Sequence, residues 1–397
     1  MINSEVFSAG TVFVIAELVH VVRWSRMRIS RQDFIELFDV VQKLPNLLGV
    51  FSSEYLKVST PKNHLVLEFS AVVACRLRCL VEGQFNESFQ FCYVNRHLMS
   101  SFVLAAKDIK SKADFELELH QPDRNHAVLV IKNGRRIGQF AILDKESGSC
   151  PQVVTDKNGF SPVSNSDQLK KLVGCAVPFV SLQPSEPELC CVMMGKNIYA
   201  ANQYSGLRIR QDTGMKKFPI PLMLGRTWSE LGGEVETSGQ YVRIRLSHGL
   251  IGQSVYMPAS KNFPIDKFNA LYSSAKQGLL VEMNRDSLVA VVKRYETYLE
   301  TASDKEKFMH LVLTPRETEA RLKAMVQGTE FDEPVKLEAP VTGLQESQEA
   351  VFGSEYFLPF VRAIEKEKEP VTLRTAPKFP YVFRCGKFDF FLARAVK

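Results

Sequence analysis

The last third of the chain, residues 285–397, has an order of elements that occurs twice more upstream, and this repetition constrains the fold more than any other feature. Apolar residues at helical spacing predict one amphipathic helix at 286–300. A second helix is predicted at 354–367, with Ser354 as its N-cap. Strand-like runs follow each helix, at 308–313, 319–325 and 335–339 and then at 370–374, 381–384 and 388–396.

Two earlier copies follow the same order of helix, strands, helix and strands. In the middle copy, helices are predicted at 167–174 and 221–231, and strands at 188–194, 196–201, 241–246 and 252–257. In the first copy, helices are predicted at 31–44 and 95–107, and strands at 55–58, 64–69, 74–81, 115–119, 127–131 and 137–143. The copies share almost no residues, so the repeat is one of pattern.

Chain length agrees with this division, because 397 residues exceed what one hydrophobic core usually holds. The prediction is an α+β protein with three similar domains, at 27–150, 160–280 and 284–397, each with two helices packed on antiparallel sheet. Residues 1–26 precede the pattern, and we interpret them as an N-terminal extension or the product of an upstream start codon. The segment 261–283 reads as a linker, yet Phe263, Pro264 and Phe268 make it apolar enough to pack on a surface.

Composition is that of a globular protein, with 45% hydrophobic and 24% charged residues. No run of 18 apolar residues occurs, so no membrane segment is predicted. The net charge of +6 permits an anionic partner without requiring one. Eight scattered cysteines and no standard secretory signal favour free thiols in a cytoplasmic protein.

Motifs for catalysis are missing from the sequence. It contains no phosphate-binding Gly-rich loop and no HExxH, and its seven histidines stand apart from any nucleophile at motif spacing. Cys75 and Cys79 lack neighbouring ligands for zinc, and Cys190 and Cys191 are adjacent on a predicted strand, so buried thiols are expected. We therefore expect no enzyme activity, no metal and no cofactor.

The remaining signal is a set of cations on or beside the six predicted helices. Each one alone is best explained as part of a solvated helix face. If the helices share one side of the molecule, however, the cations form a surface that binds phosphates without reading sequence. Acids on the same helices would keep that binding loose. The cations are Arg31, Lys43, Arg96, Lys107, Lys170, Lys171, Arg226, Lys293, Arg294, Arg362 and Lys366, and the nine from Arg96 onward are the candidate DNA contacts.

Local sequence matches accompany the threefold order. They are Met27-Arg28-Ile29-Ser30 at the opening strand, residues 198–207, Asn262-Phe263-Pro264, and the run from 331–333 to 352–357. Over residues 27–397 the chain resembles the bacterial sliding clamp, the beta subunit of DNA polymerase III. It departs from that family at the Thr-Asp-Gly-x-Arg-Leu loop, where only Leu207 matches, and in its C-terminal residues and basic charge. A phage or plasmid version would fit this divergence.

The resemblance implies a homodimer of three-domain subunits that closes head to tail into a ring. Such a ring encircles duplex DNA and holds the replicative polymerase on it. Alternatives remain open: a clamp-fold scaffold for a transcription or repair factor, and, less favoured, an enzyme.

The resemblance also implies a pocket between the second and third domains, where short peptides of the polymerase and the clamp loader bind. Three phenylalanines within four residues of the last predicted strand are consistent with an apolar site there, although an ordinary domain contact would need them equally. By position in the family, the walls of this pocket are Leu207, Pro264, Phe268, Phe391, Leu392 and Ala393.

Overall fold

The computed structural model describes residues 23–31, 55–60, 64–71, 75–82, 84–85, 89–95, 113–121, 127–142, 159–183, 185–214, 217–238, 241–248, 251–258, 263–274, 278–300, 307–326, 328–376 and 379–394. The chain forms two compact units, each made of two stretches of sequence. Unit 1 contains residues 1–163 and 226–258, and unit 2 contains residues 164–225 and 259–397. This division into two units does not test the three predicted domains, which remain a prediction.

Unit 1 is organised around an antiparallel sheet in the order β10-β15-β16-β17-β4-β3-β2-β6-β9-β8-β7-β1-β5. The pairing of β17 with β4 joins strands from the middle and first copies of the repeat. The strands are β1 (Arg23–Ile29), β2 (Tyr55–Thr60), β3 (His64–Ala71), β4 (Cys75–Glu82), β5 (Gln84–Phe85), β6 (Phe89–Asn95), β7 (Phe115–Gln121), β8 (Ala127–Asn133), β9 (Arg135–Ile142), β10 (Ser161–Pro162), β15 (Glu234–Ser238), β16 (Tyr241–His248) and β17 (Ile251–Pro258).

Unit 2 contains two antiparallel sheets, in the orders β14-β11-β12-β13-β25-β24-β23-β18 and β21-β20-β19-β22. Burial alternates residue by residue along β20, as expected for a strand with one face on a core. The strands are β11 (Cys191–Met194), β12 (Ile198–Ala201), β13 (Ser205–Ile209), β14 (Phe218–Pro221), β18 (Leu279–Met283), β19 (Phe308–Leu313), β20 (Glu319–Val326), β21 (Thr329–Lys336), β22 (Gln348–Gly353), β23 (Val371–Thr375), β24 (Tyr381–Cys385) and β25 (Phe388–Leu392).

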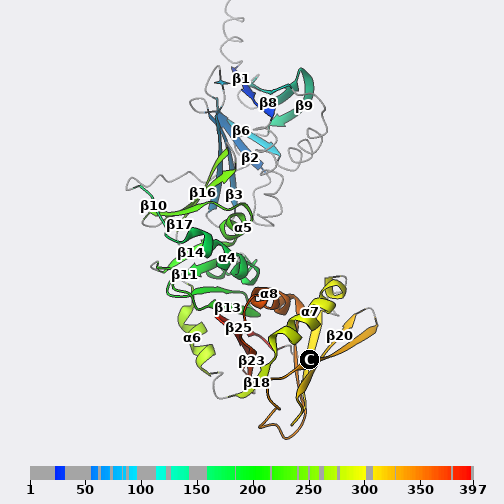
Figure 1. The fold of residues 1–397 in the computed structure, drawn as a ribbon. Helices are drawn as coiled ribbons and strands as arrows, with labels where there is room; N and C mark the ends of the chain where they lie inside the picture. Colours follow the sequence, from blue (N-terminus) through cyan, green and yellow to red (C-terminus); the bar gives the residue numbers. More distant parts are fainter. Residues whose placement is uncertain are drawn as a thin grey trace, which may run out of the picture. The chain divides into compact units, whose positions relative to one another are not determined.

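Three helices of unit 2 form a layer on these sheets: α4 (Ser166–Ala176), α7 (Arg285–Glu300) and α8 (Ser354–Ile364). Helix α8 contacts both α4 and α7, and α7 packs on β20 and β21 (Figure 1). The core beneath α8 is aromatic, with the Phe360 and Phe390 rings stacked at 4.9 Å. Helix α6 (Ile265–Ser274) packs on the other face of the larger sheet, where its Phe268 ring lies 5.1 Å from the Phe391 ring of β25. Helix α5 (Leu222–Leu231) runs from unit 2 into unit 1.

In the third copy, both predicted helices and the strand runs at 308–313, 319–325, 370–374, 381–384 and 388–396 are found, whereas the run at 335–339 overlaps only the end of β21. On α7, Leu288, Val291, Val292 and Tyr295 of the apolar stripe are buried. The helix at 221–231 is confirmed as α5. The N-cap prediction for Ser354 is wrong, because Gly353 is the N-cap and the Ser354 hydroxyl donates to Lys307 O at 3.1 Å. The predicted helices at 31–44 and 95–107 lie outside the described residues, apart from Arg31 and Asn95.

Several elements were not predicted. The supposed linker contains α6 and β18, and β1 begins at Arg23, inside the segment interpreted as an extension. Strands β13, β14 and β22 also lacked a clear signal, because they are short and their burial does not alternate cleanly along the sequence.

Candidate nucleic-acid interface and partner site

The helix layer of unit 2 brings together six of the nine candidate DNA contacts. They come from three helices that touch in the order α4, α8, α7. The prediction required the helices to share one side, and within unit 2 they do. The six are Lys170 and Lys171 on α4, Lys293 and Arg294 on α7, Arg362 on α8, and Lys366 two residues beyond the end of α8.

Half of these cations already have carboxylate partners. Lys293 Nζ lies 3.2 Å from Glu365 Oε2, and Arg362 bonds Glu296, so both pairs join α7 to the α8 region. Arg294 Nη2 lies 2.7 Å from Glu333 of β21. All three cations are about half exposed, and exposed pairs of this kind add little stability. Their main effect is to reduce the positive charge that the layer offers to an anion.

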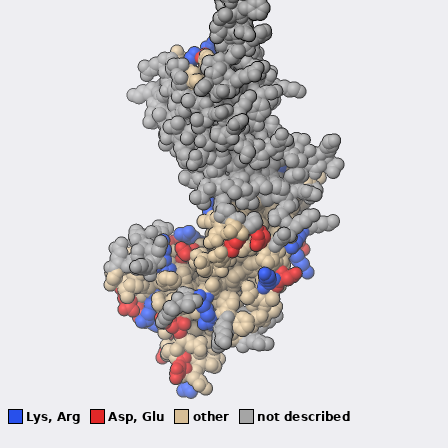
Figure 2. Space-filling view, turned by 180° about the vertical axis from the view of Figure 1, so that it is seen from behind, with Lys and Arg blue, Asp and Glu red and all other residues tan. Residues whose placement is uncertain are grey.

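The other three cations, Lys170, Lys171 and Lys366, have no carboxylate partner among the described residues. Over α4, α7 and residues 354–367, the layer carries equal numbers of acidic and basic side chains. Figure 2 shows one face of unit 2, seen from behind, with Lys and Arg interspersed with Asp and Glu. The layer is therefore a mixed surface with three available cations, not a uniformly basic one.

The remaining candidate contacts are placed elsewhere. Arg226 lies on α5 in unit 1, where it is half-buried, and burial lowers the pKa of its guanidinium. Arg96 and Lys107 lie outside the described residues.

The proposed partner site falls on the seam between β13 and β25, which joins strands of the middle and third copies. Five residue pairs hold the seam, from Ser205 opposite Leu392 to Ile209 opposite Phe388. The pairing continues past one end of the ladder, where Ala393 N donates to Tyr204 O at 2.7 Å. The two copies therefore share one continuous sheet here.

The seam separates the six predicted pocket residues onto two faces, because neighbouring strand residues point to opposite sides. Phe391 lies on the α6 face, 5.1 Å from the Phe268 ring. Leu207 is paired with Phe390, whose ring lies on the helix-layer face. Leu392 has the same parity as Phe390 and is also buried. Pro264 and Ala393 are half-buried. The residues do not line a single surface.

Gly206 on β13 was not singled out from the sequence, yet it makes the α6 face possible. An added Cβ would stand 2.0 Å from Phe391 Cε1 and 2.8 Å from Phe268 Cε1. The Phe391 ring thus lies directly over the Gly206 backbone. It packs there with Phe263, Phe268 and Tyr272 in one buried cluster with Tyr199 of β12.

The turn before β13 differs in sequence from the family loop but is well held. Asn202 Oδ1 accepts hydrogen bonds from the backbone N–H groups of Tyr204, at 2.9 Å, and Ser205, at 2.8 Å. The turn leaves Tyr204 half exposed, with its ring 5.5 Å from Tyr356 of α8. The only sequence signal for the Tyr204–Tyr356 pair was a tyrosine, Tyr204, within an otherwise polar turn.

The expected buried thiols are confirmed for Cys190 and Cys191, whose side chains are almost fully covered. Burial raises the pKa of Cys191 to about 12. The side chains of Cys75 and Cys79 lie outside the described set. The described residues contain no cluster of three or more metal-ligating side chains, and no helix within them has the length and hydropathy to cross a membrane.

Comparison with solved structures identifies the architecture. The beta sliding clamp of Caulobacter crescentus, solved with polyethylene glycol bound, matches with a TM-score of 0.67 at 14% identity, over 94% of this chain and 100% of that one. The chain has the sliding-clamp fold. The sliding clamp of Bacillus subtilis gives a TM-score of 0.64 at 12% identity with the same coverage, and the Borrelia burgdorferi DNA polymerase III beta subunit gives 0.66 at 10% identity over 94% and 98%. No family model and no curated protein matches the sequence.

Proposed function

We propose that this protein is a DNA sliding clamp, a processivity factor that encircles duplex DNA and holds a replicative polymerase there. The observation that carries the proposal is the clamp fold along 94% of the chain, which matches the full length of solved clamps. The absence of catalytic motifs from the sequence agrees with a protein that works by topology. A cytoplasmic location is part of the same proposal.

The helix layer of unit 2 would face the DNA. A ring that stays on DNA because it is closed needs only weak phosphate contacts, and the equal numbers of acids and bases in the layer suit such contacts. Lys170, Lys171 and Lys366 are the contacts we expect to matter most, because Lys293 and Arg294 are neutralised by acids on the protein itself.

Charge reversal can test this assignment. Changing Lys170, Lys171 and Lys366 to Glu should weaken DNA binding and flatten its salt dependence by about 0.9 in the log–log slope for each lost contact. A control changes Lys293 and Arg294 to Glu and should flatten the slope less for each residue changed. Equal effects per residue in the two variants, or no effect in the first, would count against the helix layer as the DNA surface.

Ring closure requires two chains, and the third copy offers a fitting surface for the contact. Strand β21 is an edge strand of its sheet in the described structure. Beside this edge, Tyr298 at the end of α7 is half exposed and lies 4.7 Å from Phe331 of β21. We propose that this edge and Tyr298 meet the first domain of a second copy.

Light scattering at micromolar concentration should therefore give a dimer. Tyr298→Glu should shift the chain toward monomer, whereas Phe308→Glu, an exposed change on β19 of the same sheet, should not. A monomeric wild-type chain would refute the dimer. A Tyr298→Glu chain that stays dimeric would show that the contact between the two chains lies elsewhere.

Peptides of the polymerase and the loader would dock at the β13–β25 seam. Of the predicted pocket residues, Leu207 and Leu392 are buried on the helix-layer face and would support the site from beneath, whereas Phe268 and Phe391 lie on the opposite face. The half-exposed Tyr204 ring beside Tyr356 of α8 would supply the accessible part. A few buried aromatic anchors usually carry most of the energy of such contacts.

This site predicts that Tyr204→Ala should abolish polymerase stimulation while leaving the dimer and its melting temperature unchanged. Leu182→Ala, which removes a side chain equally exposed, is the matched control. Full processive synthesis with the Tyr204 variant would show that the partner binds elsewhere.

A further inference from the structure

A buried carboxylate on β25 lies among three arginine side chains, two more than would neutralise its charge. Asp389 is 0% exposed. Its Oδ2 accepts hydrogen bonds from Arg208 Nε at 2.9 Å and Nη2 at 2.5 Å, and its Oδ1 accepts one from Arg384 Nε at 2.6 Å. Arg210 Nε lies 3.5 Å from Oδ2. One carboxylate thus faces three guanidinium groups, which leaves a surplus of two positive charges.

Arg208 alone would neutralise Asp389. Its Nε and Nη2 both donate to Oδ2, and such charge-assisted hydrogen bonds are stronger than neutral ones. Its Nη1 donates to Asn269 Oδ1 of α6 at 3.2 Å, and its guanidinium lies 4.1 Å from the centre of the Tyr272 ring. Its side chain is only 15% exposed. Arg208 is therefore a structural partner that also attaches α6 to the sheet.

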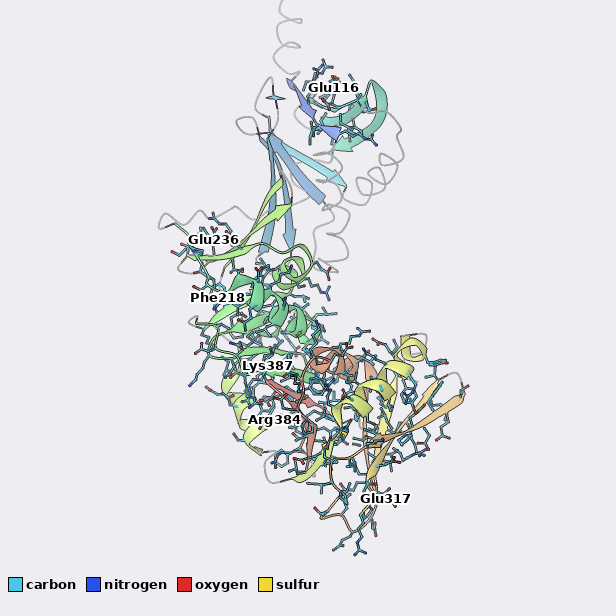
Figure 3. The ribbon with its side chains drawn as sticks, viewed as in Figure 1. Glu116, Phe218, Glu236, Glu317, Arg384 and Lys387 are labelled. Atoms are coloured by element: carbon cyan, nitrogen blue, oxygen red, sulfur yellow. The ribbon has the colours of Figure 1, made fainter. Side chains whose placement is uncertain are left out.

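Arg210 and Arg384 are different, because both are nearly half exposed, at 43% and 46%. Arg384 uses only its Nε, and its two terminal nitrogens have no partner among the described residues. Arg210 donates Nη2 to Gly386 O and keeps Nη1 available. Arg384 Nε is hydrogen-bonded to Oδ1 and Arg210 Nε lies 3.5 Å from Oδ2, so the two guanidinium groups flank one carboxylate. Figure 3 labels Arg384 and, on the following turn, Lys387.

Acids on the adjoining loops have contacts of their own. Asp212 Oδ1 accepts a hydrogen bond from Gly214 N at 2.9 Å, which closes its turn. Glu367 lies 4.0 Å from Lys387 Nζ. Neither Asp212 nor Glu367 pairs with Arg210 or Arg384 among the described residues, so the two extra positive charges beside Asp389 are not neutralised by a second carboxylate.

We propose that Arg210 and Arg384 form an oxyanion site that takes a phosphate group. The two terminal nitrogens of Arg384 and Nη1 of Arg210 can donate to phosphate oxygens, and the two positive charges complement the double negative charge of a phosphate. Asp389 holds Arg384 through its Nε, and Gly386 O holds Arg210 through its Nη2, which lowers the entropy lost on binding. The phosphate can be a free ion or the terminal phosphate of a nucleic-acid strand. The site lies on the sheet face opposite the helix layer and does not depend on the proposed clamp function.

The test is a calorimetric titration of the full chain with sodium phosphate at constant ionic strength, with sodium chloride as the blank. Saturable binding is expected. Arg384→Gln and Arg210→Gln should each weaken it about tenfold or more, the value of a lost charged hydrogen bond. Both variants keep the Arg208–Asp389 pair, so they should stay folded, and their melting temperatures check this. Arg321→Gln, another half-exposed arginine held by an aspartate, is the matched control and should bind like the wild type.

Two further titrations identify the source of the phosphate. Stronger binding of 5′-phosphorylated oligo-dT than of unphosphorylated oligo-dT would assign the site to a strand end. Equal binding of the two strands, with saturable inorganic phosphate, would assign it to the free ion. The proposal is overturned if phosphate binds no better than chloride, or if the Arg210→Gln/Arg384→Gln double variant binds it like the wild type.

Discussion

Replacing Gly206 by alanine should loosen the α6 face of unit 2. The new Cβ would stand 2.0 Å from Phe391 Cε1, whereas carbon atoms normally approach to about 3.5–4.0 Å. The Phe391 ring would have to move by roughly 1.5 Å to reach that separation. It has little room, because it is almost buried and packs against Phe268 and Tyr272.

The size of the effect follows from two opposing terms. Overpacking of this kind costs about 1–3 kcal/mol, and contact with two rings places the change near the upper end. Alanine recovers about 0.5–1 kcal/mol, because a strand glycine loses more backbone entropy on folding. The net destabilisation should be about 2 kcal/mol, which raises the equilibrium constant for local opening roughly thirtyfold.

Hydrogen exchange measured on peptides from β13, β25 and α6 is the suitable assay, because a chain with two units need not unfold in one step. Gly195→Ala is the matched control, since its nearest neighbours would lie 3.8 Å from the new Cβ. Adding Phe391→Leu to Gly206→Ala should restore much of the protection. Exchange that is equal in the two alanine variants would refute the reasoning.

Three other predictions concern buried or paired groups. Asp389→Asn should cost about 3–5 kcal/mol, because it leaves three arginines without their carboxylate, and an unchanged melting temperature would contradict this. The hydrogen bond from Arg321 lowers the pKa of Asp332, so its stabilisation is complete above the unfolded pKa of about 3.9 and is lost as pH falls through the lower folded pKa. The protection factors of the β20 and β21 amides against hydrogen exchange should fall only below about pH 4. Protection factors that have already fallen at pH 6 would contradict this. Cys191, with its pKa near 12, should resist iodoacetamide at pH 8 in the native chain and react after denaturation, as peptide mass mapping would reveal.

The sequence predicted best where one element buries one face. The stripe of α7 follows directly from packing against a single core and is readable without the structure. The run at 319–325 was predicted as a strand, but the alternating burial along β20 was seen only in the structure. Helix α6 was missed because Phe263, Pro264 and Phe268 suggested a linker on a surface, and its amphipathic period covers only ten residues.

The candidate sites were harder to predict, because their geometry depends on long-range pairing. The β13–β25 register decides that Leu207 and Phe391 lie on opposite faces, and residues almost two hundred positions apart set that register. The cations on the helices were visible in the sequence, but their carboxylate partners come from other elements. Glu333, for example, reaches Arg294 from β21, so the number of available charges could not be counted in advance.

We propose that two chains close around duplex DNA. A linear duplex with a biotin at each end tests it: the chain is allowed to thread onto the DNA, streptavidin then blocks both ends, and dissociation is followed at high salt. A closed ring should stay on the blocked DNA long after it has left the same DNA with open ends, because salt screens phosphate contacts but does not open a ring. Equal dissociation rates from blocked and open DNA would contradict the account.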